Sequence, residues 1–279
     1  MEPEKSHIHP TNSVSTSVSS STMSAYATPI AIVLAGLFIG GGLFMGLSKN
    51  KSNPSVSTGN QQAQQEALNT TKDQMAKLIK APEKAYLDTD LASGKLIILG
   101  HADAPLTITY WYDYQCPFCK TVDVGGDPRI PIQPSIPTII SKYVNTGKVK
   151  LIFKSFPFLG ADSTTGAEYA HAIWKLYPEK FFDWHTAMMQ VQDAEGDQGF
   201  GNAETIDILI SLIPGIDDAK VKQYIIDNKD TLDATISAEQ KDGSNHGVTG
   251  TPGFRIGTKQ IDGAQKPQAF IDAIESQLK

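Results

Sequence analysis

The chain is poor in cysteine, with only two in 279 residues. Two thiols are too few for a small domain held together by disulfides or for an all-cysteine zinc site. Basic residues are also in the minority, because 24 Lys and Arg stand against 30 Asp and Glu and give a formal net charge of −6. A general nucleic-acid binder would need a basic surface, so we predict no nucleic-acid partner. With 40% hydrophobic residues, the chain can still form a sizeable core.

Charged residues are absent from positions 25–47, which contain a strongly apolar run at 30–39. As a helix rising about 1.5 Å per residue, this segment reaches about 34 Å, enough to cross a hydrocarbon core of about 30 Å. A cleaved signal peptide is the alternative, but it would have a shorter apolar region and a small-residue cleavage site. We therefore predict a single transmembrane anchor in the lipid bilayer at 25–47, preceded by a disordered Ser/Thr-rich tail at 1–24.

The segment 48–85 is predicted to be a tether between the anchor and the folded part of the chain. Residues 48–62 are rich in Ser, Asn and Gln, a composition typical of a flexible linker. Residues 64–80 contain helix formers with loosely periodic apolar positions, which predicts either a short stalk helix or the first helix of the domain. The remaining residues, 86–279, are predicted to form one domain.

Strand and helix patterns follow one another through this domain. A continuous apolar and β-branched run at 106–112 is typical of a central strand covered on both faces. Apolar stripes at helical spacing fill 164–247 and predict a helical insert. In chain order we predict a strand at 95–99, a strand at 106–112, a helix, a strand at 149–156, the helical block at 164–247, hairpin strands at 253–256 and 260–261, and a helix covering 270–278.

Both cysteines lie in one motif, Cys116-Pro117-Phe118-Cys119, directly after the strand predicted at 106–112. In the first turn of a helix, this spacing brings the two sulfurs close enough to form a disulfide. The first cysteine would lie at the helix N-terminus, where unpaired backbone N–H groups and the helix dipole stabilise a thiolate. Pro117 suits the first turn because no helical partner exists there for an N–H. We predict Cys116 as the nucleophile and Cys119 as the resolving thiol.

A C-x-x-C motif can also be half of a metal site or an inert disulfide. The six histidines show no paired H-x3–5-H spacing, so we predict no zinc ligands. A disulfide that closes so small a loop adds little stability. A carrier that binds a soft ion such as Cu(I) through the two thiols stays open as a function of a different class.

A second motif, Gly247-Val248-Thr249-Gly250-Thr251-Pro252, places a proline before the predicted hairpin. The two motifs, with the helical block between them, resemble the DsbA-like thiol–disulfide oxidoreductases of the thioredoxin superfamily over about residues 95–279. The resemblance implies an α/β, thioredoxin-like fold with a helical insertion. It also implies a cis Thr251–Pro252 bond beside the Cys116 sulfur and a Thr251 backbone that pairs with substrate peptide.

The resemblance further implies a function and a location. Cys116 and Cys119 would form disulfide bonds in exported, cysteine-containing proteins, with no cofactor beyond this redox pair, and a membrane partner would reoxidise them. The catalytic domain would lie outside the cytoplasm, held at the cell membrane by one span. Lys49 and Lys51 follow that span, and the positive-inside rule would place the domain in the cytoplasm instead. A reductase or isomerase of the same fold stays open.

The chain departs from the family pattern at residues near the two cysteines, which would tune the reactivity of the thiols. The middle pair Pro117-Phe118 lacks the imidazole of a Pro-His pair, so we expect a weaker oxidant. Tyr110 stands six residues before Cys116, where many thioredoxins carry a buried Asp. Asp113 is closer to the motif, but we expect it to cap the loop rather than to transfer protons.

The helix that follows Cys119 is expected to be only about two turns long. The segment 125–137 is rich in glycine and proline and interrupts the helix before it resumes near 138–145. This insert could screen substrates beside the active site or be an ordinary surface loop.

Overall fold

The computed structural model describes residues 58–192 and 201–278. The predicted tail at 1–24 and the predicted anchor at 25–47 lie outside these ranges, so both stay predictions. None of the helices within the described ranges is long and apolar enough to cross a lipid bilayer.

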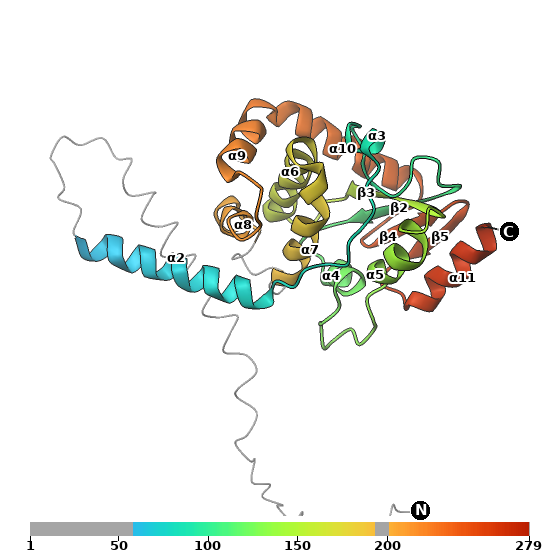
Figure 1. Ribbon diagram of the computed structural model, residues 1–279, viewed down its shortest axis with the longest axis horizontal. Helices are drawn as coiled ribbons and strands as arrows, with labels where there is room; N and C mark the ends of the chain where they lie inside the picture. Colours follow the sequence, from blue (N-terminus) through green and yellow to red (C-terminus); the bar gives the residue numbers. More distant parts are fainter. Residues whose placement is uncertain (1–57, 193–200, 279) are drawn as a thin grey trace, which may run out of the picture.

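The centre of the fold is a sheet of five strands in the order β1-β3-β2-β4-β5 (Figure 1). β2 and β3 are parallel, and each of the other neighbouring pairs is antiparallel. The predicted central strand does occupy the middle of the sheet, where most of its residues are buried. The strands are β1 (Ile97–Leu99), β2 (Leu106–Tyr112), β3 (Val149–Ser155), β4 (Gly253–Ile256) and β5 (Lys259–Asp262).

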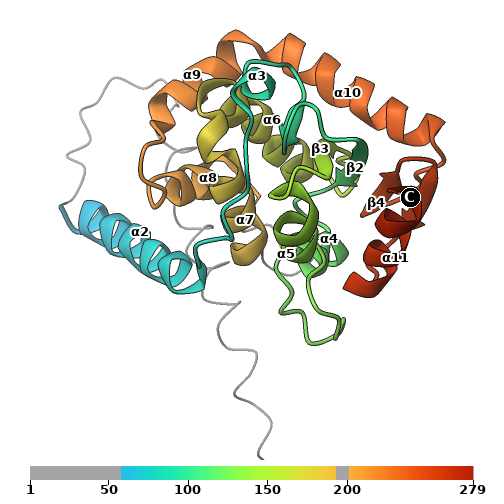
Figure 2. The same ribbon diagram turned by 45° about the vertical axis from the view of Figure 1, so that its right-hand side comes forward.

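Helices surround this sheet and form a separate block at one end of it (Figures 1 and 2). Within the described residues, the predicted helical block at 164–247 contains five α-helices, because Pro178 begins a separate 3-10 turn and Gly215, at φ 94°, separates α8 from α9. The helices are α2 (Thr58–Leu78), α3 (Thr89–Ala92), α4 (Pro117–Asp123), α5 (Ile136–Ile139), which continues as a π-helical turn (Ile140–Val144), α6 (Ala161–Leu176), the 3-10 turn (Pro178–Lys180), α7 (Phe181–Val191), α8 (Ala203–Ile210), α9 (Asp218–Asp227), α10 (Lys229–Asn245) and α11 (Pro267–Gln277).

Alternate residues of β2 enter two different parts of the core. Tyr110 and Tyr112 belong to the large hydrophobic cluster, to which α4, α5, α7 and α11 also contribute. Trp111 packs with Phe156 and Val248 in a smaller cluster, and its indole N–H donates to the Glu239 carbonyl of α10 at 3.3 Å. The strand therefore has a buried layer on each side and holds its C-terminal end, where the cysteine motif begins, in a fixed position.

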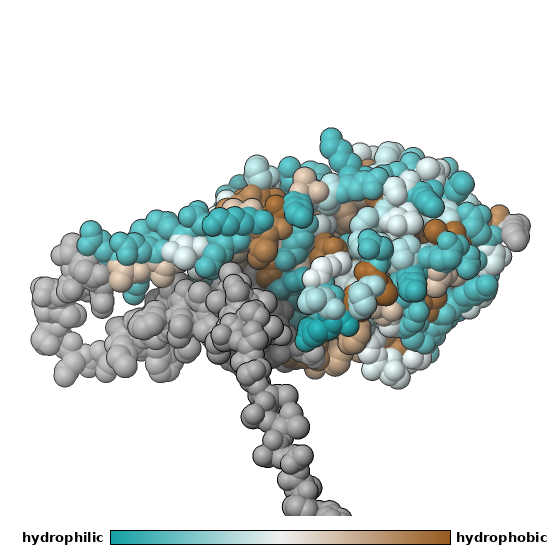
Figure 3. All heavy atoms as spheres, turned by 90° about the horizontal axis from the view of Figure 1, so that it is seen from below, coloured by the Kyte–Doolittle hydropathy of each residue, from teal (hydrophilic) through white to brown (hydrophobic). Residues whose placement is uncertain are grey.

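α2 begins at Thr58, inside the predicted linker at 48–62, because Gln and Ala after Gly59 favour a helix once it has started. Its C-terminal half is anchored: Thr71 and Met75 are buried, and Met75 belongs to the core cluster with residues of α7 and α8. Gln190 of α7 exchanges two hydrogen bonds with the backbone of Lys80. Most of the α2 surface seen in Figure 3 is hydrophilic. The predicted domain start at residue 86 stays a prediction.

Candidate active site

The cysteine motif begins where β2 ends. Cys116 is the N-cap of α4, in an extended conformation, and Pro117 occupies the first helical position. α4 ends at Asp123 after seven residues, which confirms the expected two-turn helix. Because the N-terminal N–H groups of a helix have no helical partners, they face the Cys116 sulfur and favour its thiolate.

Asp113 holds the turn that joins β2 to α4. Its carboxylate accepts the N–H of Gln115 at 2.8 Å and the N–H groups of Phe158 and Leu159 at 3.0 and 3.3 Å. The Asp113 carbonyl accepts the N–H of Cys116 at 3.1 Å. Asp113 therefore caps the loop, as the sequence predicts, and fixes the segment after β3 beside the motif.

The predicted site residues come together from two distant parts of the chain. The Cys116 thiol donates to the Thr251 carbonyl at 3.3 Å, and the Thr251–Pro252 peptide bond is cis. Both cysteines are reduced and buried, with exposed fractions of 3% for Cys116 and 0% for Cys119. Phe118, between them, is 48% exposed, so an aromatic ring lies at the surface next to a covered sulfur.

The two thiols hold their protons with different strength. A hydrogen bond from the Cys119 thiol, helped by the Thr251 side chain and the backbone N–H groups of Cys119 and Phe118, lowers the pKa of Cys116 to about 7 against the opposing effect of burial. Burial, and then the adjacent Cys116, raise the pKa of Cys119 well above its ordinary value. Near neutral pH, a substantial fraction of Cys116 is therefore thiolate while Cys119 stays a thiol. This is the order of acidity that a nucleophilic Cys116 and a resolving Cys119 need, and the two roles stay predictions.

Gln192, at the end of α7, holds the same turn from the other side. Its side-chain amide donates to the backbone carbonyls of Tyr114 and Cys116. Its backbone carbonyl accepts a hydrogen bond from the Lys120 ammonium at 2.7 Å. This contact could not be predicted from the sequence, because it joins residues 76 positions apart.

A chain of buried polar side chains lies behind Cys119. The Tyr110 hydroxyl donates to the Asp123 carboxylate at 2.6 Å, and the other oxygen of Asp123 lies 3.1 Å from His185 Nε2. His185 Nδ1 lies 2.9 Å from the Tyr114 hydroxyl, which is 3.3 Å from that of Tyr112. Sequence reasoning singled out Tyr110 but missed Asp123 and His185. Asp123, one helical turn after Cys119, was the available signal; His185 comes from a different helix.

A metal is the remaining chemistry to consider. Across 58–192 and 201–278, no group of three His, Cys, Asp or Glu side chains is placed to hold an ion. A soft ion held by the two thiols would not need a third such ligand, so the carrier function stays an untested alternative.

Comparisons with known proteins agree on one fold. A family model described as thioredoxin matches residues 92–276. The chain is 31% identical over 125 residues to the "Probable disulfide bond formation protein D" of Bacillus anthracis, covering 45% of this chain and 54% of that protein. It is 24% identical over 182 residues to "Disulfide bond formation protein D" of Bacillus subtilis, covering 65% and 77%. The match thus spans about half the length of the first of these relatives.

Solved structures show the same architecture. Oxidised BdbD of Bacillus subtilis superposes with a TM-score of 0.57 at 22% identity, covering 71% of this chain and 98% of that one. The protein alpha-DsbA1 of Wolbachia pipientis superposes with a TM-score of 0.54 at 20% identity, covering 66% and 90%. At these identities the structures establish a thioredoxin-like fold.

Proposed function

The chain belongs to the thioredoxin family, and from this premise we propose that it is a thiol–disulfide oxidoreductase that forms disulfide bonds in exported proteins through Cys116 and Cys119. The observation that carries the proposal is the position of the Cys116 sulfur, at the N-terminus of α4 and 3.3 Å from the Thr251 carbonyl. Relatives named as disulfide bond formation proteins support the same chemistry.

In the oxidised enzyme, a substrate thiolate attacks the Cys116 sulfur and displaces Cys119, giving a mixed disulfide. A second thiolate of the substrate then attacks the substrate sulfur that is bonded to Cys116. The substrate disulfide forms, and Cys116 leaves as a thiolate. The lowered pKa of Cys116 makes it a good leaving group and favours transfer of the disulfide to the substrate. The Thr251 carbonyl faces this sulfur and is placed to pair with an extended substrate backbone.

We infer that the catalytic domain works outside the cytoplasm, tethered by the predicted anchor at 25–47. Disulfides persist in oxidising compartments, and the apolar run at 30–39 suits a membrane span. Reoxidation of Cys116 and Cys119 then needs a membrane partner that accepts two electrons. The redox pair itself serves in place of a cofactor.

The trapping variant Cys119→Ser tests this function and its location together. Without the resolving thiol, mixed disulfides on Cys116 persist, and we expect their isolation from intact cells to yield exported proteins that contain cysteine. The matched control Cys116→Ser should trap no proteins. Cytoplasmic partners on Cys116 would contradict the location, and stoichiometric Cu(I) in the reduced protein without disulfide exchange would favour the metal carrier.

A further inference from the structure

Gln192 is a buried polar residue beside the redox pair, yet the exchange of sulfur bonds does not involve it directly. It follows Val191, the last residue of α7, and is 5% exposed. Its backbone leaves the helical conformation there, at φ −49° and ψ 127°. Burial of a side-chain amide is costly unless its N–H groups find partners. The partners of Gln192 therefore indicate what its burial achieves.

The amide nitrogen of Gln192 is used on the turn that carries Cys116. It donates to the backbone carbonyl of Tyr114 and, at 3.1 Å, to that of Cys116. A primary amide has two N–H groups, so it can serve two acceptors at once. One side chain of α7 therefore holds two carbonyls, one on each side of Gln115.

The Tyr114 carbonyl depends on this contact. Tyr114 is 2% exposed, and within the described ranges no other group donates to its carbonyl. A buried carbonyl without a donor is costly, so loss of the Gln192 amide would move the turn or leave this oxygen unpaired. The Cys116 carbonyl keeps a partner in either case, because it also accepts the backbone N–H of Lys120 at 3.1 Å. The turn before Cys116 is therefore the segment most sensitive to Gln192.

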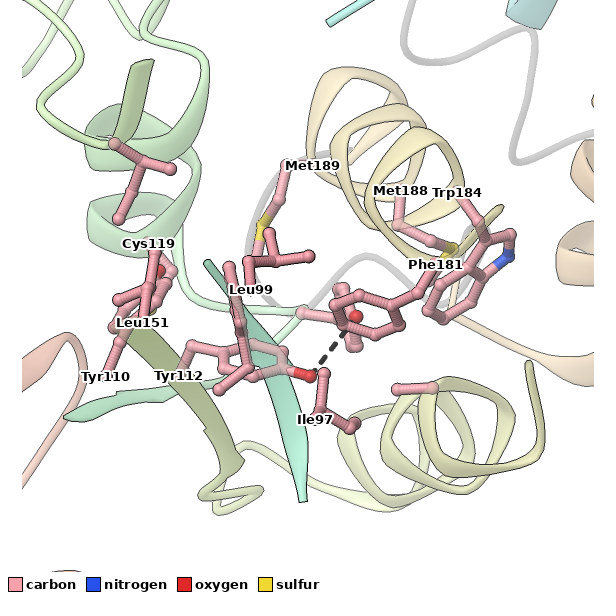
Figure 4. Packing of buried hydrophobic residues seen from close by; sticks show 14 of the residues in the cluster. Ile97, Leu99, Tyr110, Tyr112, Cys119, Leu151, Phe181, Trp184, Met188 and Met189 are labelled. Carbon is pink, nitrogen blue, oxygen red and sulfur yellow. Dashed lines mark hydrogen bonds between the residues drawn. The ribbon is translucent and has the colours of Figure 1, made fainter. Parts of the chain in front are cut away.

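α7 gives this side chain a rigid base. Figure 4 shows Trp184 and Met189 of α7 in the packed cluster that also contains Cys119 of α4. The ring of Tyr114 meets that of Trp184 edge-on, with the ring centroids 5.3 Å apart. α7 therefore holds Tyr114 at its ring and at its carbonyl.

The Cys116 sulfur needs a fixed turn because its hydrogen-bonding partners come from separate parts of the chain. The backbone N–H groups of Phe118 and Cys119 belong to α4, whereas Thr251 precedes β4. Such hydrogen bonds weaken steeply when the distance or angle drifts. The Asp113 carbonyl holds the backbone N–H of Cys116 at 3.1 Å, but this contact leaves the carbonyl side of the turn free. That side is the one that the Gln192 amide holds.

We propose that Gln192 is a positioning residue for Cys116, whose amide holds the turn so that the sulfur stays directed at the N-terminus of α4 and at Thr251. This inference rests on the proposed thiol–disulfide exchange and adds to it a residue that touches neither sulfur. Glutamine suits the position because it is neutral and donates twice. A carboxylate there would face two carbonyl oxygens and place a negative charge near the thiolate.

The surroundings of Gln192 define what a substitution changes. Its backbone carbonyl accepts the Lys120 ammonium at 2.7 Å, and a new side chain leaves this contact in place. Cys119 and Thr251, which face the Cys116 sulfur, also stay. Gln192→Met removes the two N–H groups but keeps nearly the same length and volume. Its effect on Cys116 would therefore come from the lost hydrogen bonds to the turn.

The first test measures alkylation of Cys116 by iodoacetamide in the reduced, full-length protein between pH 5 and pH 10. The wild-type midpoint is expected at about 7, and Gln192→Met should raise it by about one pH unit, because the thiolate loses aligned donors. Gln192→Leu also lacks a donor and should behave alike, so the test does not depend on one variant folding. An unchanged midpoint in either variant, with folding checked by circular dichroism, would overturn the proposal.

A matched control comes from a second glutamine of the same helix. Gln190 exchanges two hydrogen bonds with the backbone of Lys80, at 2.7 and 3.0 Å. Gln190→Met therefore also removes two backbone hydrogen bonds from α7, but none of them reaches the turn at Cys116. Its midpoint should stay at about 7. An equal rise in Gln190→Met would mean that any loosening of α7 disturbs Cys116, and the specific role of Gln192 would be overturned.

The second test measures the exchange equilibrium with glutathione, in which two glutathione thiols reduce the Cys116–Cys119 disulfide and leave as glutathione disulfide. If only the thiolate of Cys116 is affected, a rise of its pKa by about one unit from about 7 disfavours reduction of Gln192→Met. The equilibrium constant should hardly change at pH 6 and should fall about twofold at pH 7 and about ninefold at pH 9.

The pH dependence separates this role from a purely structural one. Gln190→Met should follow the wild type at each pH. A change in Gln192→Met by one factor at every pH would mean that the substitution disturbs the fold around both redox states, and it would overturn the proposal. Wild-type protein that does not exchange with glutathione would instead contradict the proposed function.

Discussion

At the scale of single residues, the active site depends on an unequal pair of thiols. Cys116 and Cys119 are both buried, but only Cys116 lies at a helix N-terminus and receives hydrogen bonds that favour its thiolate. The closeness of the two sulfurs could be predicted because one helical turn places both of them, whereas their order of attack stays a prediction. The contacts of Asp123, His185 and Gln192 could not be predicted, because they depend on how α7 docks against α4.

The reactivity of Cys116 with iodoacetamide should report this inequality. Thiolate is the reacting species, so the alkylation rate should rise with pH through a midpoint of about 7 rather than near the ordinary value of 9.0. Cys119→Ala removes the hydrogen-bond donor that contributes most, so its midpoint should move upwards. Cys119→Ser keeps a donor and should move it less. A wild-type midpoint near 9 would refute an activated nucleophile.

At the scale of elements, the strands were more predictable than the helix boundaries. β2 has the predicted bounds of 106–112, because an unbroken apolar and β-branched run is typical of a central strand that is covered on both faces. The start of α2 was missed because its first residues are polar and weakly patterned. The approach of α10 to the sheet depends on Gly243, where an added Cβ would lie 2.9 Å from Trp111 and 3.0 Å from Phe156.

Gly243→Ala should therefore destabilise the protein, although alanine favours helix more than glycine does. Trp111 is hydrogen-bonded to Glu239 and cannot retreat freely, so we expect a loss of about 1–3 kcal/mol from overpacking, measured by urea unfolding. Ser244→Ala, at the exposed next position of α10, should change stability by less than about 0.5 kcal/mol. Equal or greater stability of Gly243→Ala would show that α10 can shift away from the sheet.

At the scale of the whole molecule, the direction of electron flow depends on the redox potential of the cysteine pair. Equilibration with glutathione should give a potential between thioredoxin's, about −270 mV, and DsbA's, about −120 mV, and nearer the second for an oxidase. Phe118→His should raise it, since an imidazolium beside Cys116 favours the thiolate. Phe118→Leu, the control, should leave it nearly unchanged. A wild-type potential at or below about −270 mV would indicate the reductase.

The outer edge of the sheet bears on the proposed function. β5 is the last strand in the sheet order, and its exposed positions carry Lys259, Gln260 and Asp262. An open edge attracts other extended segments, and charged side chains along it oppose such pairing. Under the proposed function, substrate chains held at Cys116 are therefore discouraged from adding to the sheet at β5. A thiol–disulfide oxidoreductase with such an edge would not become a seed for β-structure in its substrates.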